Sequence, residues 1–384
     1  MVTNGRSLML NRRQFSAGLG AILLSPSFAV AAAAEGVVDM AGRQVSLIKP
    51  AERIVLLDAR DIVSMAVLHP DPARVVIGWA GADTLDSDLL RRHYETRPDG
   101  SGEIAVVGGQ TATTVSLERI LALKPDLVVT TAYMEPELGD GVLTRRLEAA
   151  GIPVVFSNTA SNEQTTEADR DPFAAMARTM RMWGQILGKS DRAETFVGFA
   201  HEHLNEVRQR LGATSPTKAY LEVQSTYDDC CWAAGDRIWG DLLALAGGHN
   251  LSAVDAPWFA KVALEQLIAE APEIYIASGG AFGRGIRPAI GPGLDPDEGG
   301  EGLRRLTERT GFETLPAVQD GRVHGVWTGL LTIAPFNILF VECAAKWLHP
   351  DLFADLEPTD TLNALNEQFL AKPLPGPCWL SLAA

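Results

Sequence analysis

Apolar and polar positions predict strands and helices that alternate along most of the chain. From Arg53, the stretch "RIVLLDARDIVSMAVL" predicts a buried strand followed by a helix, and "ARVVIGWAG" predicts a second short strand that ends in glycine. The stretch "VSLERILALKPDLVVTTA" predicts a helix, a Lys-Pro-Asp turn and a strand, and "RRLEAAGIPVVFSN" repeats that order with a helix closed by Gly151. Strands and helices that alternate on this scale predict an α/β lobe with a mainly parallel sheet.

A long helical stretch separates this region from a second one of the same kind. Its amphipathic pattern is broken only near Gly188 and Lys189, and it carries no strand signal. After "GATSPT" the alternation returns with "KAYLEVQ", "VALEQLIAEAPEIYIASG" and "GRVHGVWTG". We therefore predict an N-terminal α/β lobe over 36–168, a connecting helical segment over 169–212, a C-terminal α/β lobe over 213–350, and a tail with a short helix over 351–384.

The first 34 residues have the composition of an export signal. Arg12 and Arg13 precede an apolar stretch broken by glycine and proline, and small residues follow it. The arginine pair with Phe15 resembles a twin-arginine signal, whereas Asn11 and Ser16 depart from its usual flanks and leave the general secretory route open. We predict a signal peptide over 1–34 and a periplasmic protein after its cleavage. No cysteine follows the apolar run, so a lipid anchor is not expected.

The net charge limits the classes of partner, and the cysteines indicate whether a disulfide is expected. With 33 Lys and Arg against 48 Asp and Glu, the formal net charge is −15, which excludes a nucleic-acid partner. In an oxidising compartment the cysteines favour one disulfide. Adjacent Cys230 and Cys231 rarely pair with each other, so we expect one of them to pair with Cys378 and leave Cys343 aside.

One phrase occurs twice, starting at Val115 and again at Val262. On a helix, each copy traces a mainly apolar stripe at three-and-four spacing, which predicts packing: Leu117, Ile120, Leu121 and Lys124 in the first copy, and Leu264, Leu267, Ile268 and Ala271 in the second. Glu118 and Glu265 are offset from the stripe, so they should point outward in the first helical turn, where the helix dipole favours a carboxylate.

The element order, the doubled phrase, the long connector and "GRVHGVWTG" before a late helix resemble the periplasmic substrate-binding proteins of iron-siderophore, haem and cobalamin importers. The resemblance covers most of the chain after Gly36. It implies two Rossmann-like α/β lobes joined by a single long helix, with ligand in the cleft between them. It also implies that Glu118 and Glu265 pair with arginines on the permease of an inner-membrane ABC importer. A monomer without stable membrane insertion, catalytic residues, metal site or cofactor is expected.

Candidate ligand residues lie where parallel strands end, because open α/β sheets bind ligands at their carboxyl edges. Aromatic faces would cover a planar chelate, and arginines would bind its negative charge. The candidates are Trp79, Gln110, Thr111, Tyr133, Tyr227, Trp232, Arg237, Trp258, Phe259, Arg284, Arg287 and Trp327. The run "GPGLDPDEGGEG" that follows Arg284 and Arg287 is expected to be a mobile insertion.

The arginines favour a ferric siderophore, or a similar anionic iron chelate, as the ligand. Haem stays open because Tyr133, Tyr227 and His249 offer axial ligands, and cobalamin is compatible with an aromatic cleft. An extracytoplasmic enzyme on the same two-lobed fold is the alternative from another class, although the chain lacks GxSxG, HExxH and dinucleotide motifs. His201 and His203 are two residues apart and are expected to be solvated.

Overall fold

The computed structural model describes residues 36–161, 170–376 and 378–382, all within one compact unit that spans Glu35–Ala384. The predicted signal peptide lies outside these residues. Within them, no helix combines the length and apolar character needed to cross a membrane.

The N-terminal lobe is built on a five-stranded sheet in the order β5-β4-β3-β6-β7, in which all neighbours are parallel. Its central strands are buried along their whole length, as parallel strands covered on both faces should be. The strands are β3 (Ile54–Leu56), β4 (Val76–Ala80), β5 (Ala105–Gly108), β6 (Leu127–Thr131) and β7 (Val154–Asn158). Its helices are α1 (Asp61–Leu68), α2 (Asp88–Tyr94), α3 (Leu117–Leu123) and α4 (Val142–Ala149), and a hairpin of β1 (Gly36–Val38) and β2 (Gln44–Ser46) precedes them.

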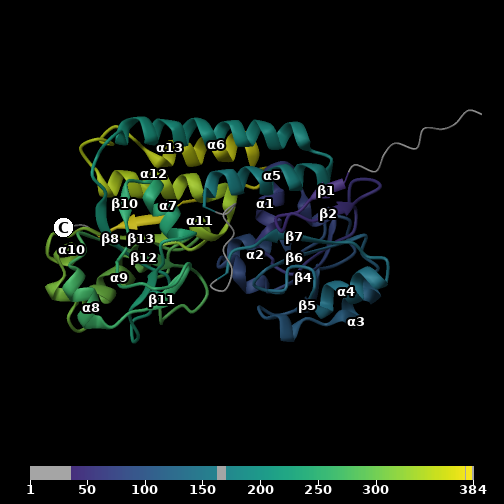
Figure 1. Ribbon diagram of the computed structural model, residues 1–384, viewed down its shortest axis with the longest axis horizontal. Helices are drawn as coiled ribbons and strands as arrows, with labels where there is room; N and C mark the ends of the chain where they lie inside the picture. The colour runs from purple at the N-terminus through teal and green to yellow at the C-terminus, as the bar shows by residue number, and fades with distance from the viewer. Residues whose placement is uncertain (1–35, 162–169, 377, 383–384) are drawn as a thin grey trace, which may run out of the picture. The chain divides into compact units, whose positions relative to one another are not determined.

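Two helices connect the lobes, and they meet at the predicted break. Asp171 caps α5 (Pro172–Leu187) by accepting hydrogen bonds from the next residues, and Gly188 ends it in the left-handed region at φ 64°. The 22-residue α6 (Ser190–Leu211) then runs across both lobes (Figure 1). Its buried face packs against α5 and α12 (Asn337–Leu348).

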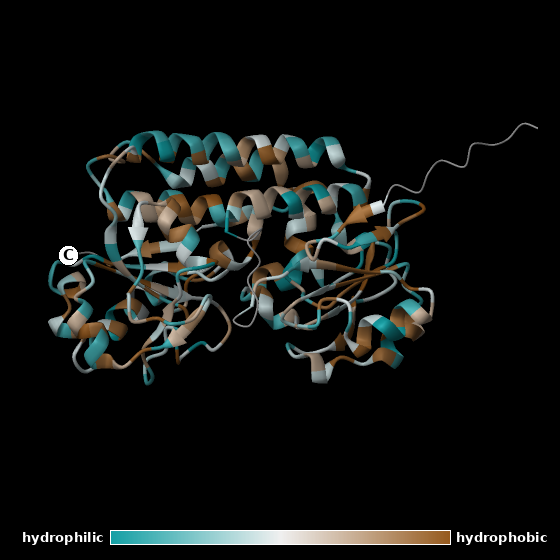
Figure 2. Ribbon diagram, in the orientation of Figure 1, coloured by the Kyte–Doolittle hydropathy of each residue, from teal (hydrophilic) through white to brown (hydrophobic). Residues whose placement is uncertain are grey.

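The C-terminal lobe has a seven-stranded mixed sheet. Strands β8 (Thr217–Glu222), β12 (Ile274–Gly279), β13 (Val323–Trp327) and β10 (Gly248–His249) pair in parallel, and β9 (Trp232–Ala234), β11 (Phe259–Lys261) and β14 (Trp379–Ser381) add antiparallel edges. The remaining helices are α7 (Trp239–Leu245), α8 (Leu264–Glu270), α9 (Pro296–Thr307), α10 (Pro316–Gln319), α11 (Gly329–Thr332) and α13 (Pro358–Phe369). In both lobes the sheets are mostly hydrophobic (Figure 2). The predicted α/β fold with two lobes is confirmed.

The doubled phrase forms the same unit in each lobe. Helices α3 and α8 both end at a left-handed residue, Lys124 at φ 50° and Ala271 at φ 48°, and a proline and a central strand follow each of them. Ile120 and Leu267 are fully buried beneath these helices. Leu121 is 38 % exposed, so the predicted packing stripe was wrong at this position, because a two-turn helix covers its sheet with one narrow face.

The predicted mobile insertion after Arg287 was wrong, because much of it forms helix α9. Asp295 caps the helix by accepting from the Asp297 amide at 3.0 Å, and Pro296 occupies its first turn. Gly299 and Gly302 are buried, where a Cβ atom would collide with Leu380 and Tyr227. The Asp-Pro pair at the start of this helix is a sequence signal from which the helix could have been predicted.

The expected disulfide partner was also wrong. Cys230 and Cys231 are bonded to each other, across a cis peptide that leaves their Cα atoms 3.1 Å apart. Cys343 and Cys378 are free and buried in the core, and burial raises the pKa of both thiols.

Candidate functional site

A cavity of about 290 Å³ lies between the two lobes. Its wall includes residues that directly follow parallel strands of both sheets: Leu57 after β3, Gly81 after β4, Val223 after β8 and Thr328 after β13. The carboxyl edges of the two sheets therefore face one another across the cavity, at the place where open α/β sheets bind ligands.

Aromatic side chains supply much of the wall. Tyr133 comes from the N-terminal lobe, and Trp239, Trp258, Phe259 and Phe282 come from the C-terminal lobe. Trp258 and Phe259 pack edge to face with ring centroids 5.3 Å apart. Tyr133 and Phe282 are 54 % and 55 % exposed, so they present large apolar surfaces to solvent at the cavity. Such a wall suits a ligand with extended flat or apolar faces.

Both arginines on the wall are engaged by aspartates. Arg60 donates from Nε to Asp58 Oδ1 at 3.0 Å and from Nη2 to Oδ2 at 2.5 Å. Arg287 donates from Nη1 to Asp86 Oδ2 at 3.3 Å and from Nη2 to Thr328 Oγ1 at 2.8 Å. Asp83 also lines the wall, so three aspartates face two arginines and the summed formal charge of the wall is slightly negative.

The pKa values at the cleft reflect burial and these pairs. Burial opposes ionisation of Asp58, yet the charge and hydrogen bonds of Arg60 hold its pKa below the usual value. Burial raises the pKa of Asp86, and Arg287 offsets part of that rise. Burial, together with the nearby charge of Asp58, raises the pKa of Asp61 to about 8, although Ser157 donates a hydrogen bond to it at 2.7 Å.

The structure brings five of the predicted ligand residues together on this wall: Gln110, Tyr133, Trp258, Phe259 and Arg287. The other seven, Trp79, Thr111, Tyr227, Trp232, Arg237, Arg284 and Trp327, are not part of it. Trp79 and Trp327 are buried in the strands β4 and β13, with 2 % and 0 % exposure, so as core residues they have no surface to offer a ligand. Tyr227 instead lies under Arg305, whose guanidinium carbon is 4.0 Å from the ring centroid.

Sequence reasoning missed several residues of the wall, namely Asp58, Arg60, Asp83, Asp86, Trp239 and Phe282. Asp58 and Arg60 could have been found, because "LLDAR" places two charged residues directly after a buried strand. Asp86 follows a 3-10 turn (Ala82–Leu85), and no pattern in the sequence relates it to Phe282, which is distant along the chain.

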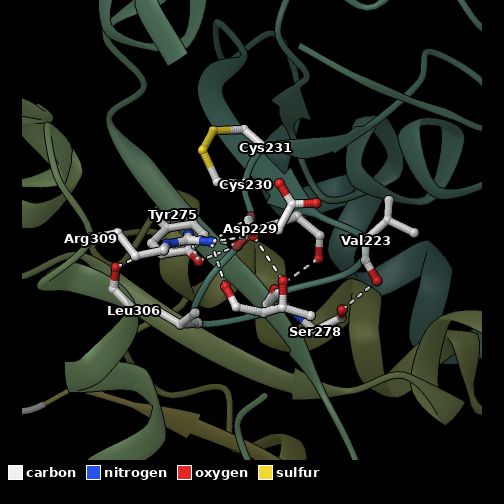
Figure 3. Close-up of polar contacts among 11 residues, drawn as sticks. Val223, Asp229, Cys230, Cys231, Tyr275, Ser278, Leu306 and Arg309 are labelled. Atoms are coloured by element: carbon white, nitrogen blue, oxygen red, sulfur yellow. Dashed lines mark hydrogen bonds and ion pairs between the residues drawn. A yellow bond between two sulfur atoms is a disulfide. The ribbon is translucent and has the colours of Figure 1, made fainter. Parts of the chain in front are cut away.

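A buried polar network holds the segment that leaves β8 (Figure 3). The first residues of that segment, Val223 and Gln224, line the cavity. Glu222, fully buried, accepts from Arg309 Nη1 and Nη2, each at 2.9 Å, and also from the Tyr275 hydroxyl. Arg309 Nη1 also donates to the main-chain oxygens of Thr226 at 3.1 Å and Asp229 at 3.4 Å. The network therefore fixes the position of the main chain between β8 and the Cys230–Cys231 disulfide.

The two glutamates of the doubled phrase are exposed in the first turns of α3 and α8. Figure 1 shows these helices at the end of each lobe away from α6. Both carboxylates are thus available to a partner that spans the two lobes.

One predicted solvated histidine is in fact paired. His203 Nδ1 lies 2.8 Å from Oε1 of Glu342, which is buried in α12, and this hydrogen bond raises the pKa of His203. The pair fastens α6 to the C-terminal lobe. Among the described residues, no group of three or more His, Cys, Asp or Glu is arranged to hold a metal ion.

A family profile described as "Periplasmic binding protein" matches residues 65–326. Among curated proteins, a vitamin B12-binding protein of Yersinia pestis is 27% identical over 214 residues, which cover 56% of this chain and 69% of the relative.

Solved structures share the fold. A TroA-like periplasmic binding protein, FepB, from Veillonella parvula superimposes with a TM-score of 0.75 at 22% identity and covers 91% of this chain and 99% of its own. MolA of Haemophilus influenzae, bound to molybdate, superimposes with a TM-score of 0.68 at 19% identity and covers 89% and 99%.

Proposed function

Because this chain belongs to the periplasmic binding protein family, we propose that it captures a metal chelate in the cleft between its lobes and delivers it to an inner-membrane ABC importer. Proteins of this family bind small molecules and pass them to ABC permeases. An aromatic wall at the carboxyl edges of two facing sheets supports capture, since it offers contact area to a large ligand. A volume of about 290 Å³ is at the low end for ligand cavities, so a bulky chelate would fill it with one face and extend beyond it.

The charge of the wall decides which chelate we favour. The sequence suggested an anionic ferric siderophore because arginines were expected to bind its charge. Arg60 and Arg287 are instead neutralised by Asp58 and Asp86, so an anion would meet paired guanidinium groups and an additional carboxylate. We therefore propose a corrinoid, a metal macrocycle without net negative charge, and the name of the Yersinia relative agrees with this choice.

A ferric siderophore is the second candidate, and one atom of the wall is available to it. The buried Nε of Arg287 has no hydrogen-bond partner among the described residues, although the side chain lines the cavity. A chelate oxygen placed there would satisfy the donor. The same Nε–H would donate to a corrinoid amide oxygen equally well, so it does not exclude the first candidate.

Ligand titration separates these possibilities. The mature protein is titrated with cyanocobalamin, a ferric hydroxamate siderophore and haem, with tryptophan fluorescence and calorimetry as readouts. We expect saturable binding of cyanocobalamin at submicromolar to micromolar levels. Saturation by the siderophore alone would move the assignment to the second candidate, and no response to any of the three would reject capture of a chelate.

A matched pair of variants tests the wall itself. Tyr133→Ala removes an exposed ring from the cavity and should weaken binding about 2- to 13-fold, in line with the ~0.5–1.5 kcal/mol of an aromatic contact. Val142→Ala truncates a residue of similar exposure, 58 %, in the same lobe but away from the wall, and should leave affinity unchanged. Equal effects of the two changes would place the ligand elsewhere.

Delivery is tested at the exposed glutamates. The double variant Glu118→Lys and Glu265→Lys should keep ligand affinity but abolish uptake by cells, because both docking charges are reversed. The control variant carries Glu137→Lys and Glu313→Lys, which reverse one exposed carboxylate in each lobe outside α3 and α8. Loss of uptake in both would show an effect of net charge and not of a docking site.

A further inference from the structure

Asp86 belongs to the N-terminal lobe, but four hydrogen bonds reach it from the C-terminal lobe. Its Oδ1 accepts from the Phe282 amide at 2.7 Å, and its Oδ2 accepts from Arg287 Nη1 at 3.3 Å. Its main-chain oxygen accepts from Trp327 Nε1 at 3.0 Å and from the Ala281 amide at 3.2 Å. One residue of the first lobe therefore anchors two separate parts of the second, the loop over 281–287 and the end of β13.

The segment that supplies most of these donors, residues 280–293, is here called the cross-lobe segment. It is shaped to reach Asp86, because a Cβ atom at Gly280 would fall 1.9 Å from Asp86 Oδ2. Farther along, the Ser87 hydroxyl donates to the Pro292 carbonyl at 3.3 Å. The contact thus extends along both chains beyond the aspartate.

The cross-lobe segment is also fastened to its own lobe. Gly280 N donates to Pro288 O at 3.0 Å, which closes the segment on itself. Tyr227 N donates to Ile286 O at 2.8 Å, and Arg287 Nη2 donates to Thr328 at 2.8 Å. A movement of the C-terminal lobe would therefore carry the segment with it and pull on Asp86.

We propose that Asp86 and the cross-lobe segment form a latch that holds the two lobes together in the ligand-free protein and so fixes the width of the cleft. Asp86 is only 8 % exposed, so water competes little for its four bonds, and the one from Arg287 is charge-assisted. Both Asp86 and Arg287 line the cavity, so the latch forms part of its wall. The inference concerns the ligand-free chain and does not depend on which chelate it binds.

The lobe separation can be measured between equivalent positions of the two doubled helices. Ala122→Cys on α3 and Ala269→Cys on α8 place one nitroxide label on each lobe, since both positions are exposed. The native free cysteines are buried and the other two form a disulfide, so labelling without reductant is directed to the new sites. Pulsed electron–electron double resonance then gives the distribution of distances between the two labels in the absence of ligand.

Three variants are compared in this labelled background. Asp86→Ala removes both side-chain acceptors and should broaden the distribution and add a population at longer distance. Asp88→Ala is the control, because Asp88 is exposed and pairs only with Arg91, at 3.9 Å, among the described residues. Asp86→Asn keeps the size of the side chain and one acceptor but loses the ion pair, so it should fall between the two.

The outcomes separate a latch from a merely structural role. A folded Asp86→Ala protein whose distribution superimposes on that of the parent would overturn the proposal. If circular dichroism shows that Asp86→Ala does not fold, the folded Asp86→Asn decides: a widened distribution supports the latch, and an unchanged one rejects it.

Discussion

The ion pair between Arg309 and Glu222 permits a prediction of definite size. The substitution Arg309→Met keeps a long, unbranched side chain but removes its charge. It leaves the Glu222 carboxylate, which has no exposure to solvent, without its partner. Breaking a buried pair from one side costs ~3–5 kcal/mol, because the remaining charge stays buried without compensation. The Thr226 and Asp229 carbonyls lose a donor at the same time.

This cost translates into a shift of the melting temperature. Unfolding entropy of ~2.1 cal/mol/K per residue over a unit of about 350 residues gives a shift of ~1.4 °C for each kcal/mol. Arg309→Met should therefore lower the melting temperature by ~4–7 °C, as measured by scanning calorimetry at neutral pH.

Two further variants test whether the unpaired charge causes the shift of the melting temperature. Arg304→Met makes the same replacement at an exposed position of α9 and should shift the melting temperature by less than ~1 °C. Glu222→Gln combined with Arg309→Met removes both charges and should recover much of the loss, because no ion is then left unpaired. The reasoning fails if Arg309→Met behaves like Arg304→Met, or if the double variant is less stable than the single one.

Three other measurements follow from the described contacts. The raised pKa of Asp61 means that the folded protein keeps a proton that the unfolded chain releases, so stability should fall as pH rises from about 4 to about 8; Asp61→Asn should flatten that slope in urea titrations. Stability should fall with rising pH at His203 as well, because its raised pKa means that the stabilising pair with Glu342 is fully present below about 6.5 and is lost as pH rises through the folded value; Glu342→Gln should reduce that loss. Thiol titration of the native protein should find almost no reactive group, and denaturation without reductant should expose two, whereas four would contradict the disulfide.

Much of the fold could be predicted because its signals are local. The doubled phrase predicts two equivalent helix–turn–strand units, since an apolar helix face, a proline and a buried strand lie next to one another in the sequence. The break at Gly188 was also predicted, because a glycine between two amphipathic stretches favours the left-handed helix end. Leu121 lies outside the core although the pattern predicted that it would be packed. Such patterns do not tell how wide a face a short helix buries.

The cleft could be predicted only in part, because its walls join residues that are far apart in the sequence. Aromatic residues outside the interior strands were reasonable candidates, and Tyr133, Trp258 and Phe259, which begins the edge strand β11, do line the cavity. Trp79 and Trp327 are also aromatic but lie within the interior strands β4 and β13, where the packing of the lobe on both faces decides burial. Composition alone does not separate these two cases.

The charge state of the arginines shows why pairing has to be known before a ligand is assigned. A free guanidinium group in a cleft attracts an anion, whereas one bonded to an aspartate has already satisfied most of its charge. Arg287 does more than this, because its bond to Asp86 also joins the lobes. An anionic ligand that competed for Arg287 would have to weaken that junction, so its binding would oppose the closed cleft. A ligand without net negative charge can occupy the aromatic wall and leave the junction intact, and on this ground the fixed cleft width and the corrinoid assignment support each other.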